Sequence, residues 1–479
     1  MEFKNIGPIK QGSVELSDMT IFFGKNGTGK TYISYVIFGV LSFLSDKVPV
    51  FLNDGEIQKI TKEKRITLDY DETIERMRRT LLKEVKANMP DILKRSFNRS
   101  DKEVSEFEVT FKDEDFEKLN YFRRKEDFGD RYSVQNFSQY VIQDVEGISK
   151  EKVYDVVVAF ELAENEISIS LVEKSSGKDV FEEKYLRPRP MSTIQGSEEL
   201  LLTLNRILSS TLKNMRDSIY IPAERIGINV FLKEINKNRL SAYDKIVENA
   251  SDVSYIKGKL DAYPSPISSY LSNLNGWKDF YEIIFDKKIP FAAVELEDAR
   301  EILTSKLLRG KLTIDSEKDE FRYISNNTQD EIPLQISSSS IKSLVGLELY
   351  LQTVAKVGDY LIIDEPELNL HPEAQKDLAM VLEGLVKIGL KVIISTHSDY
   401  LIRELVNIEL EKRINADLDE TNFSNKTLAY DFIDGSINQI TNLQEQQTIG
   451  NFDEVTDDIE NKYYTLLDKY QEILEEKKK

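Results

Sequence analysis

Hydrophobic and polar positions alternate in two short runs at the start of the chain, residues 3–9 and 12–16, and this alternation predicts two strands. Residues 19–23 follow as a compact apolar run that ends at a glycine-rich turn. Residues 32–43 are apolar on most sides, as expected for a buried helix. We therefore predict a strand, a glycine-rich loop and a helix in succession.

The pattern becomes more polar after residue 53. Residues 72–89 combine helical spacing with many charged side chains and predict a helix. Residues 106–111 alternate strictly, and residues 154–162 and 166–172 also have strand character. The turn at residues 175–179 is expected to lead into a further strand. This part of the chain is therefore predicted to be mixed and largely β.

Helical patterns dominate the next part of the chain, and very apolar strands follow. A helix over residues 200–214 is expected to lead into a strand at 218–221, and residues 230–306 are predicted to be mainly helical. Short strands are then expected at residues 311–315, 321–325 and 332–336. From there to about residue 400, helices alternate with very apolar strands, which is typical of a parallel sheet covered on both faces. A charged helix is predicted at the end, residues 460–479.

The composition limits the classes of protein that the chain can belong to. It has 479 residues, 40% of them hydrophobic, and no cysteine. The lack of cysteine excludes disulfides and zinc ribbons and suits a reducing cytoplasm, where we expect the protein. The first residues show no signal-peptide pattern, and no apolar run is long enough to cross a bilayer. A net charge of −20 argues against a long electropositive track for DNA, although a local basic patch is compatible with it.

The strongest chemical signal is the glycine-rich turn itself. Residues 24–31 match G-x-x-x-x-G-K-[ST] at every required position and lie between a predicted strand and a predicted helix, as a phosphate-binding P-loop requires. Glycines let backbone N–H groups face phosphate oxygens, and the helix N-terminus adds partial positive charge. We expect Lys30 to reach the β- and γ-phosphates of ATP and Thr31 to bind Mg²⁺. The remaining nucleotide-binding residues predicted in the loop are Gly24, Asn26, Gly27, Thr28 and Gly29.

A second signal is an apolar strand that ends in two acids, Asp364 and Glu365. Asp364 is the expected Walker B carboxylate, which binds Mg²⁺ directly or through water. Glu365 is placed to orient and deprotonate the attacking water. Many buried strands end in acids, so the strength of this signal comes from its pairing with the P-loop.

The chain has only two histidines, and both lie close to these predicted strand ends. His397 follows the apolar run 392–396, and we interpret it as a functional residue of the same site as Lys30 and Glu365. His371 comes shortly after the two acids, and its role stays open between function and structure.

A run of serines, residues 337–340, precedes an apolar helix that is expected to extend to about residue 354. Serines at this position are most simply helix N-caps. The alternative is a phosphate site formed by the helix N-terminus and side chains. Its donors would be Ser338, Ser339, Ser340 and Lys342.

Together these motifs resemble the ABC-ATPase superfamily, and in particular the branch that holds OLD-family proteins, RecF, SMC-type heads and the AAA-15/AAA-21 group of bacterial ATPases. The opening run up to Thr31, the sequence DEPELNLHP at residues 364–372 and the sequence STHS at 395–398 carry the resemblance. It is specific over residues 1–40 and 330–405 and loose between them. It implies an α/β fold, a two-lobed ABC-ATPase head, with antiparallel strands in the N-terminal lobe and a parallel sheet in the C-terminal lobe.

The resemblance also implies roles for individual residues. The serine run corresponds to the signature motif, which binds the γ-phosphate of ATP held by the opposite subunit, so hydrolysis would need a head-to-head dimer. The family usually has a glycine where Ser340 stands, and a Cβ there would crowd the phosphate. Residues 369–371 take the place of the D-loop, and His397 that of the switch histidine. Residues 220–225 resemble a segment near the contact of the second lobe with nucleotide.

OLD proteins also carry a C-terminal nuclease domain. The only D-x-D run after His397 is Asp417-Leu418-Asp419, which has no apolar strand before it and is predicted to be a loop. We therefore expect an ATPase without a nuclease of its own. By resemblance, such stand-alone proteins occur in bacterial anti-phage systems such as Septu and PARIS, where a separate effector chain supplies the toxic activity.

Four hypotheses about function follow. The first is a homo-oligomeric ATPase that senses infection and controls an effector subunit, a nuclease or a toxin. The second is a DNA repair or recombination ATPase of the RecF or SMC type. The third, a transporter subunit, is disfavoured because no L-S-G-G-Q sequence is present. The fourth is an ATP-stabilised scaffold without turnover.

The predicted domains are an N-terminal ATPase lobe with the P-loop and the mixed β region at residues 1–229, a helical insertion at residues 230–306, and a C-terminal ATPase lobe at residues 307–479. The C-terminal lobe would contain the signature, the Walker B acids and the switch histidine. The insertion is the expected partner-binding surface, because no catalytic motif falls in it.

Overall fold

The structure is a computed structural model. It describes residues 1–125, 133–143, 152–161, 165–173, 192–248, 263–287, 296–315, 317–318, 320–328, 330–415, 426–440 and 461–466. The turn predicted at residues 175–179, the D-x-D run at 417–419 and most of the C-terminal helix predicted at 460–479 lie outside the described residues.

The chain divides into two compact units. The first, called here the core unit, comprises residues 1–42, 89–110 and 216–479, and the second, called here the inserted unit, comprises residues 43–88 and 111–215. The boundaries predicted at residues 229/230 and 306/307 do not coincide with this division, since the segment between them belongs to the core unit. The division of the chain into three domains stays a prediction.

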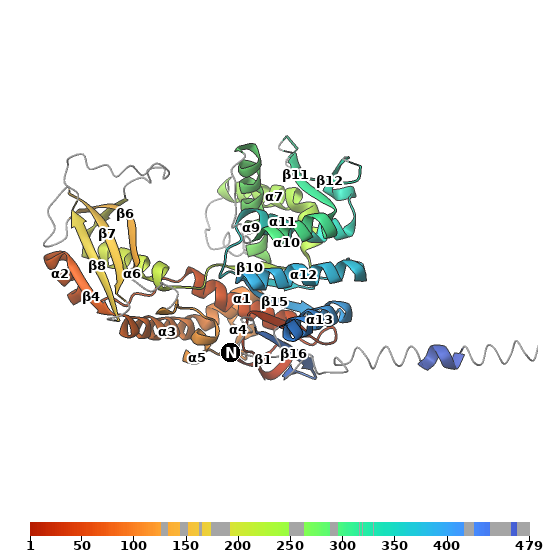
Figure 1. Cartoon of the computed structure of the whole chain (residues 1–479), viewed down its shortest axis with the longest axis horizontal. Helices are drawn as coiled ribbons and strands as arrows, with labels where there is room; N and C mark the ends of the chain where they lie inside the picture. The colour runs from red at the N-terminus through yellow and green to blue at the C-terminus, as the bar shows by residue number, and fades with distance from the viewer. Residues whose placement is uncertain are drawn as a thin grey trace, which may run out of the picture. The chain divides into compact units, whose positions relative to one another are not determined.

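A nine-stranded sheet of order β10-β14-β15-β3-β16-β17-β2-β1-β5 forms the centre of the core unit (Figure 1). Its strands are β1 (Glu2–Ile6), β2 (Ile9–Ser13), β3 (Met19–Phe23), β5 (Glu108–Thr110), β10 (Ser218–Ile221), β14 (Tyr360–Asp364), β15 (Lys391–Thr396), β16 (Thr427–Ile433) and β17 (Ser436–Ile440). The neighbours from β10 to β16 pair in parallel, and β1 pairs antiparallel with both β2 and β5.

The buried parallel strands explain the α/β fold class predicted from the sequence, which is confirmed. Every residue of β3, β10 and β14 is buried, as expected for continuous apolar strands covered on both faces. One detail differs from the expectation. The N-terminal and C-terminal strands form one sheet, because β3 pairs with β15 on one side and with β16 on the other.

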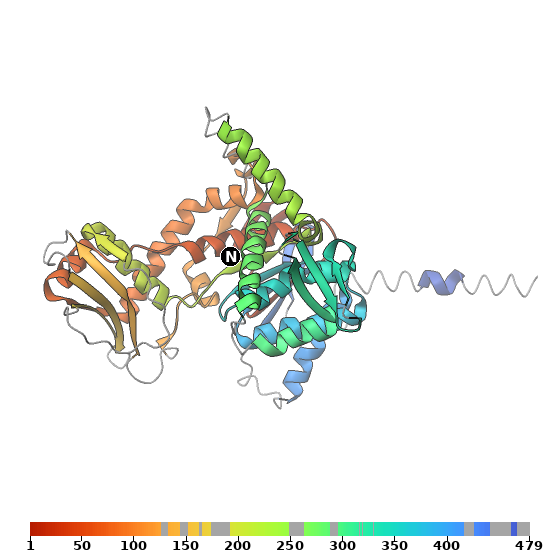
Figure 2. The same cartoon turned by 90° about the horizontal axis from the view of Figure 1, so that it is seen from above.

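The helices of the core unit build a continuous apolar core with this sheet. Figures 1 and 2 show α7, α9, α10 and α11 close to β11 and β12 in the same unit. One hydrophobic cluster contains side chains from β3 and β14 together with Tyr270, Trp277 and Leu344 from these helices. The elements are α7 (Arg225–Glu248), α9 (Ser265–Lys287), α10 (Glu297–Ile302), η4 (Leu303–Leu308), β11 (Gly310–Asp315), β12 (Glu320–Ser325), β13 (Glu331–Pro333), η5 (Leu334–Ile336), α11 (Ser339–Thr353), α12 (Pro372–Ile388) and α13 (Asp399–Asn415). The predicted strand 332–336 ends early, because Pro333 has no N–H for the ladder, and η5 follows it.

The inserted unit contains a second sheet, of order β4-β8-β7-β6-β9. Its strands are β4 (Arg65–Asp69), β6 (Ser133–Gln143), β7 (Lys152–Glu161), β8 (Glu166–Glu173) and β9 (Ser192–Gln195), and its helices include α2 (Asp54–Glu63), α5 (Asp113–Lys118) and α6 (Gly196–Leu212). The boundary between the units falls within α1 (Lys30–Asp46) and α3 (Tyr70–Phe97). Among the described helices, none combines the length and hydrophobicity needed to cross a membrane.

Candidate nucleotide-binding and hydrolysis site

The P-loop lies between β3 and α1, as the sequence predicts. Gly24 begins it with φ +134°, and an ideal Cβ at this position would lie 2.7 Å from the carbonyl oxygen of Phe432. Only glycine therefore fits, because both the backbone conformation and the close approach of β16 exclude a side chain. Asn26 and Gly27 are exposed, and the hydroxyl of Thr28 donates to the carbonyl of Lys25 at 2.8 Å.

Lys30 begins α1 and points back into the loop. Its Nζ donates to the carbonyl oxygens of Gly24 and Lys25, each at 2.9 Å, and the residue is only 5% exposed. Burial lowers the pKa of Lys30 to about 8, against the opposing effect of Asp364 and Glu365. A phosphate beside this ammonium would raise the pKa of Lys30 again, because a nearby opposite charge favours the ionised form.

Thr31 and Asp364 meet although more than three hundred residues separate them in the sequence. Thr31 Oγ1 donates to Asp364 Oδ2 at 3.0 Å, and the hydroxyl of Tyr220 donates to the same oxygen at 3.2 Å. Ser395 Oγ donates to Asp364 Oδ1. Parallel pairing of β10, β14, β15 and β3 in this order brings these groups together, because it aligns the carboxyl ends of the strands. Burial raises the pKa of Asp364 to about 7, so a cation beside it would favour the ionised form.

Glu365 and His397 lie next to each other beyond the ends of β14 and β15. Glu365 has φ +48°, and its backbone N–H donates to the carbonyl of Ser395 at 2.9 Å. The distance between His397 Nε2 and Glu365 Oε1 is 3.7 Å. Burial, together with the nearby charge of Lys30, lowers the pKa of His397, so its imidazole is neutral at physiological pH.

Glu367, in the loop that follows the Walker B strand β14, holds the end of β15 by hydrogen bonds. Its Oε1 accepts hydrogen bonds from Thr396 Oγ1 and from the backbone N–H of His397, both at 2.8 Å. Burial raises the pKa of Glu367. This carboxylate therefore places the histidine backbone relative to Glu365, a role that the sequence did not suggest.

The remaining candidates lie at the starts of two other helices. His371 is the N-cap of α12, and its Nδ1 accepts from the backbone N–H of Glu373 at 3.3 Å. Ser338 is the N-cap of α11 and accepts from the N–H of Ile341 at 3.3 Å, and its Oγ lies 2.8 Å from that of Ser340. In the described part of the chain, the hydrogen bonds of the serine run are local and none reaches the P-loop. Ser338 and Ser339 are exposed, whereas Ser340 and Lys342 are half-buried.

Three further residues near the site were not predicted to have a role. Tyr220 contacts Asp364, and Arg225 contacts the backbone after it. Asp431 lies within β16, opposite Phe23 of β3; it is 4% exposed, and its Oδ1 has no hydrogen-bond partner among the described residues. Tyr220 and Arg225 lie in the segment 220–225 whose resemblance was noted, but no signal marked Asp431, because β16 was not predicted.

The P-loop between β3 and α1, the histidine at the end of the adjacent strand β15 and the Walker B acids after the next strand, β14, define a P-loop ATPase of the ABC type. The chain belongs to the AAA_15 family: the family model, described as an AAA ATPase domain, matches residues 1–402. An ATPase of this family binds a nucleotide. No curated protein matches the chain.

Solved structures of SMC head domains are similar to the chain. One is the Smc head domain with an extended coiled coil bound to the C-terminal domain of ScpA, from Pyrococcus furiosus, at 11% identity, covering 92% of this chain and 94% of that chain, with a TM-score of 0.31. Another is the SMC head domain from Thermotoga maritima, at 10% identity, covering 92% and 96%, with a TM-score of 0.30.

Proposed function

We propose that the chain hydrolyses ATP to ADP and phosphate, slowly, and uses the nucleotide state as a switch. The observation that carries this proposal is the convergence of Lys30, Thr31, Asp364, Glu365 and His397 at the carboxyl ends of adjacent parallel strands. These groups come from three separate parts of the sequence. They are of the types that phosphate binding, metal binding and water activation require.

The site residues take distinct roles in this proposal. The P-loop residues Gly24 to Gly29 surround the phosphates with backbone N–H groups, and Lys30 neutralises charge on the β- and γ-phosphates. Glu365 orients the attacking water and accepts its proton. The neutral His397, 3.7 Å from Glu365, contacts the γ-phosphate or the water.

Thr31 and Asp364 would hold Mg²⁺. Their oxygens lie 3.0 Å apart, and hydroxyl and carboxylate oxygens are the ligands that this ion prefers. No cluster of three or more His, Asp or Glu side chains able to hold a metal occurs in the described ranges, so water and phosphate oxygens would supply the other ligands. When bound, the ion neutralises developing charge on the phosphates.

We further propose that a second copy of the chain completes the site. Ser338 and Ser339 are exposed at the start of the 15-residue helix α11, where the N-terminal partial charge favours an anion. With Ser340 and Lys342 they would contact the γ-phosphate of ATP held by the partner copy. The hydroxyl of Ser340 bonds to that of Ser338, so both are oriented at the helix end.

The biological role that we propose is that of a sensor or switch subunit in a bacterial anti-phage defence complex that controls a separate effector chain. The resemblance of residues 1–40 and 330–405 to the branch that holds OLD-family proteins and the AAA-15/AAA-21 group supports it, because stand-alone proteins of this kind occur in such systems. The net charge of −20 favours this role over a DNA repair ATPase. Residues 230–306 would contact the effector. If exchange of this segment with that of a homologue left the choice of partner unchanged, this assignment would be wrong.

The decisive experiment measures ATP turnover and oligomer size for the wild type and Glu365→Gln, with and without ATP. Loss of the general base should lower kcat by about 10²–10⁴-fold, while ATP accumulates in a dimer or larger assembly. Glu373→Gln, an exposed change at the start of α12, is the matched control and should keep wild-type turnover. If the wild type binds ATP without hydrolysing it, the chain is a scaffold instead.

Two further experiments distinguish the defence role from a DNA repair role. A large stimulation of turnover by duplex DNA would favour a repair or recombination ATPase over the defence role. In cells that carry the chain together with its effector, the wild type should reduce phage plating, and Glu365→Gln should change this protection. Equal plating with and without the chain would refute the defence role and leave the ATPase proposal intact.

A further inference from the structure

Arg225 is a fully buried arginine beside the proposed site. It is the first residue of α7, four positions after β10 ends, and it is 2% exposed. In the described part of the chain, all its hydrogen bonds go to backbone carbonyl oxygens. Nε donates to Ser343 at 2.9 Å, Nη1 to Pro222 at 3.2 Å and Asp364 at 2.8 Å, and Nη2 to Glu365 at 2.7 Å and Pro366 at 3.4 Å.

These bonds join three segments that are distant in the sequence. They are the end of β10, the first turns of the signature helix α11 and the loop that follows the Walker B strand. A guanidinium has five N–H donors in a rigid planar fork, and here each donor has an acceptor. Because the charge is buried and bonded to all three segments, a shift of one segment would be transmitted to the others.

The hydrogen bond from Arg225 to the Glu365 backbone influences where the Glu365 carboxylate lies. Glu365 has φ +48°, a left-handed conformation that is unfavourable for a residue with a Cβ. Its carbonyl oxygen accepts from Arg225 Nη2 at 2.7 Å and from the N–H of Leu368 at 3.0 Å. These bonds hold the backbone in that conformation, and the backbone sets the direction of the Glu365 side chain toward His397.

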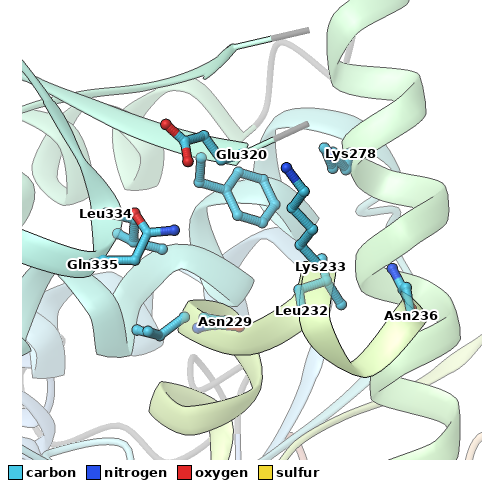
Figure 3. A pocket seen from close by; sticks show the side chains of 10 residues that line it. Asn229, Leu232, Lys233, Asn236, Lys278, Glu320, Leu334 and Gln335 are labelled. Carbon is cyan, nitrogen blue, oxygen red and sulfur yellow. The ribbon is translucent and has the colours of Figure 1, made fainter. Parts of the chain in front are cut away.

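The contact with α11 lies close to the serine run. Ser343 Oγ donates to the carbonyl of Ser340 at 2.7 Å, and the Ser343 carbonyl accepts from Arg225. One turn further along α7, Asn229 Nδ2 donates to the carbonyl of Lys342 at 2.8 Å. Figure 3 shows Asn229 lining a pocket together with Leu334 and Gln335, which lie just before the serine run. Helix α7 thus holds the first turns of α11 at two successive carbonyls.

We propose that Arg225 is a positioning residue that links the signature run to Glu365 of the same copy. Phosphate bound at Ser338–Ser340 moves the first turns of α11, and Arg225 carries this movement to the Walker B loop. Hydrolysis in one site then depends on whether the other site of the dimer is occupied. This inference rests on the proposed function, because it needs ATP and a second copy.

Arg225→Lys tests the link, since lysine keeps the charge but has only three donors on one atom. Amide hydrogen exchange with and without ATP provides a readout that does not depend on turnover. In the wild type, ATP should protect both the P-loop and residues 365–370. In Arg225→Lys, it should protect the P-loop alone, with kcat lowered about 10–100-fold and KM little changed.

Tyr281→Phe is the matched control for simple loss of stability. It removes a buried hydrogen bond to the carbonyl of Leu312 in the same core, and none of the hydrogen bonds of Arg225 goes to Leu312. It should lower the melting temperature without changing the pattern of ATP protection.

A double-mutant cycle with Ser338→Ala, followed by kcat, gives the second test. Two residues on one link should lower kcat together by much less than the product of their separate effects. If the two effects multiply, or if ATP protects residues 365–370 equally in Arg225→Lys, the link is wrong. If ATP fails to protect the P-loop of the wild type, the proposed function itself fails, and the link fails with it.

Discussion

Glu348 should destabilise the folded protein at neutral pH, and replacing it with glutamine should therefore be stabilising. It lies in the middle of α11 and is 1% exposed. Its Oε1 accepts a hydrogen bond from Gln352 Nε2 at 3.3 Å, and its Oε2 has no partner among the described residues. Burial raises the pKa of Glu348 from 4.5 to about 7, even though the guanidinium of Arg300 favours the charged form.

The sign and size of the effect follow from linkage. The folded state holds the Glu348 proton more tightly than the unfolded state, so stability falls as pH rises from 4.5 to about 7 and stays low above that range. The pKa difference of 2.5 corresponds to about 3 kcal/mol at about 1.4 kcal/mol per unit. Glutamine has the same shape and no charge to desolvate. Glu348→Gln should therefore gain up to about 3 kcal/mol at pH 8 and much less at pH 5.

Urea unfolding followed by tryptophan fluorescence measures this difference. The chain has a single tryptophan, Trp277, whose ring lies 5.7 Å from that of Tyr350 on α11, so the signal reports on the same core. Glu373→Gln on the surface of α12 should leave the urea midpoint unchanged at both pH values. A Glu348→Gln protein less stable than the wild type at pH 8 would refute the reasoning, because it would mean that Arg300 stabilises the carboxylate by more than burial destabilises it.

Two other substitutions test the site and its support. Lys30→Met should weaken ATP binding by about 10–100-fold, because it removes a charged donor to phosphate. Lys4→Met on β1 is the control and should leave ATP binding unchanged. The affinity of both variants for a fluorescent nucleotide measures the difference, and equal affinities would contradict the role of Lys30. Gly346→Ala, which in an ordinary helix would stabilise by about 1 kcal/mol, should destabilise, since its Cβ would lie 2.1 Å from the hydroxyl oxygen of Tyr270. Adding Tyr270→Phe should recover part of the loss in the urea midpoint, and a stabilising Gly346→Ala would show that this contact relaxes freely.

The groups of the site that were predicted from the sequence are those encoded in short continuous runs. The P-loop and the Walker B acids each combine a buried strand with polar residues at its end, so local pattern is sufficient to find them. Thr31 and Asp364 were both expected at Mg²⁺ from these two motifs, and the physical basis for their meeting is the rule that parallel strands align their carboxyl ends. The 3.0 Å contact between the two side chains agrees with that rule.

Asp431 shows why other parts were missed. Strand β16 is interrupted by Asp431 itself, and its pairing partner β3 lies about four hundred residues earlier in the sequence. The local sequence of either strand therefore gives no information about its pairing with the other. The carbonyl of Phe432 approaches Gly24 closely, so the shape of the P-loop depends on a strand that periodicity alone does not identify.

Arg225 shows a different limit of sequence patterns. An arginine at the start of an amphipathic helix is ordinarily expected at the surface, because burying a charge is costly unless it is fully hydrogen-bonded. Here β10 pairs with the Walker B strand β14, so the residues just after β10 emerge next to the loop that follows Asp364. That loop has a left-handed residue, Glu365, and therefore turns its carbonyl oxygens toward α7, where they satisfy the guanidinium. Arg225 is therefore buried because of the strand order and the conformation of the proposed catalytic glutamate. The residue is an arginine because several carbonyl groups there need hydrogen-bond donors.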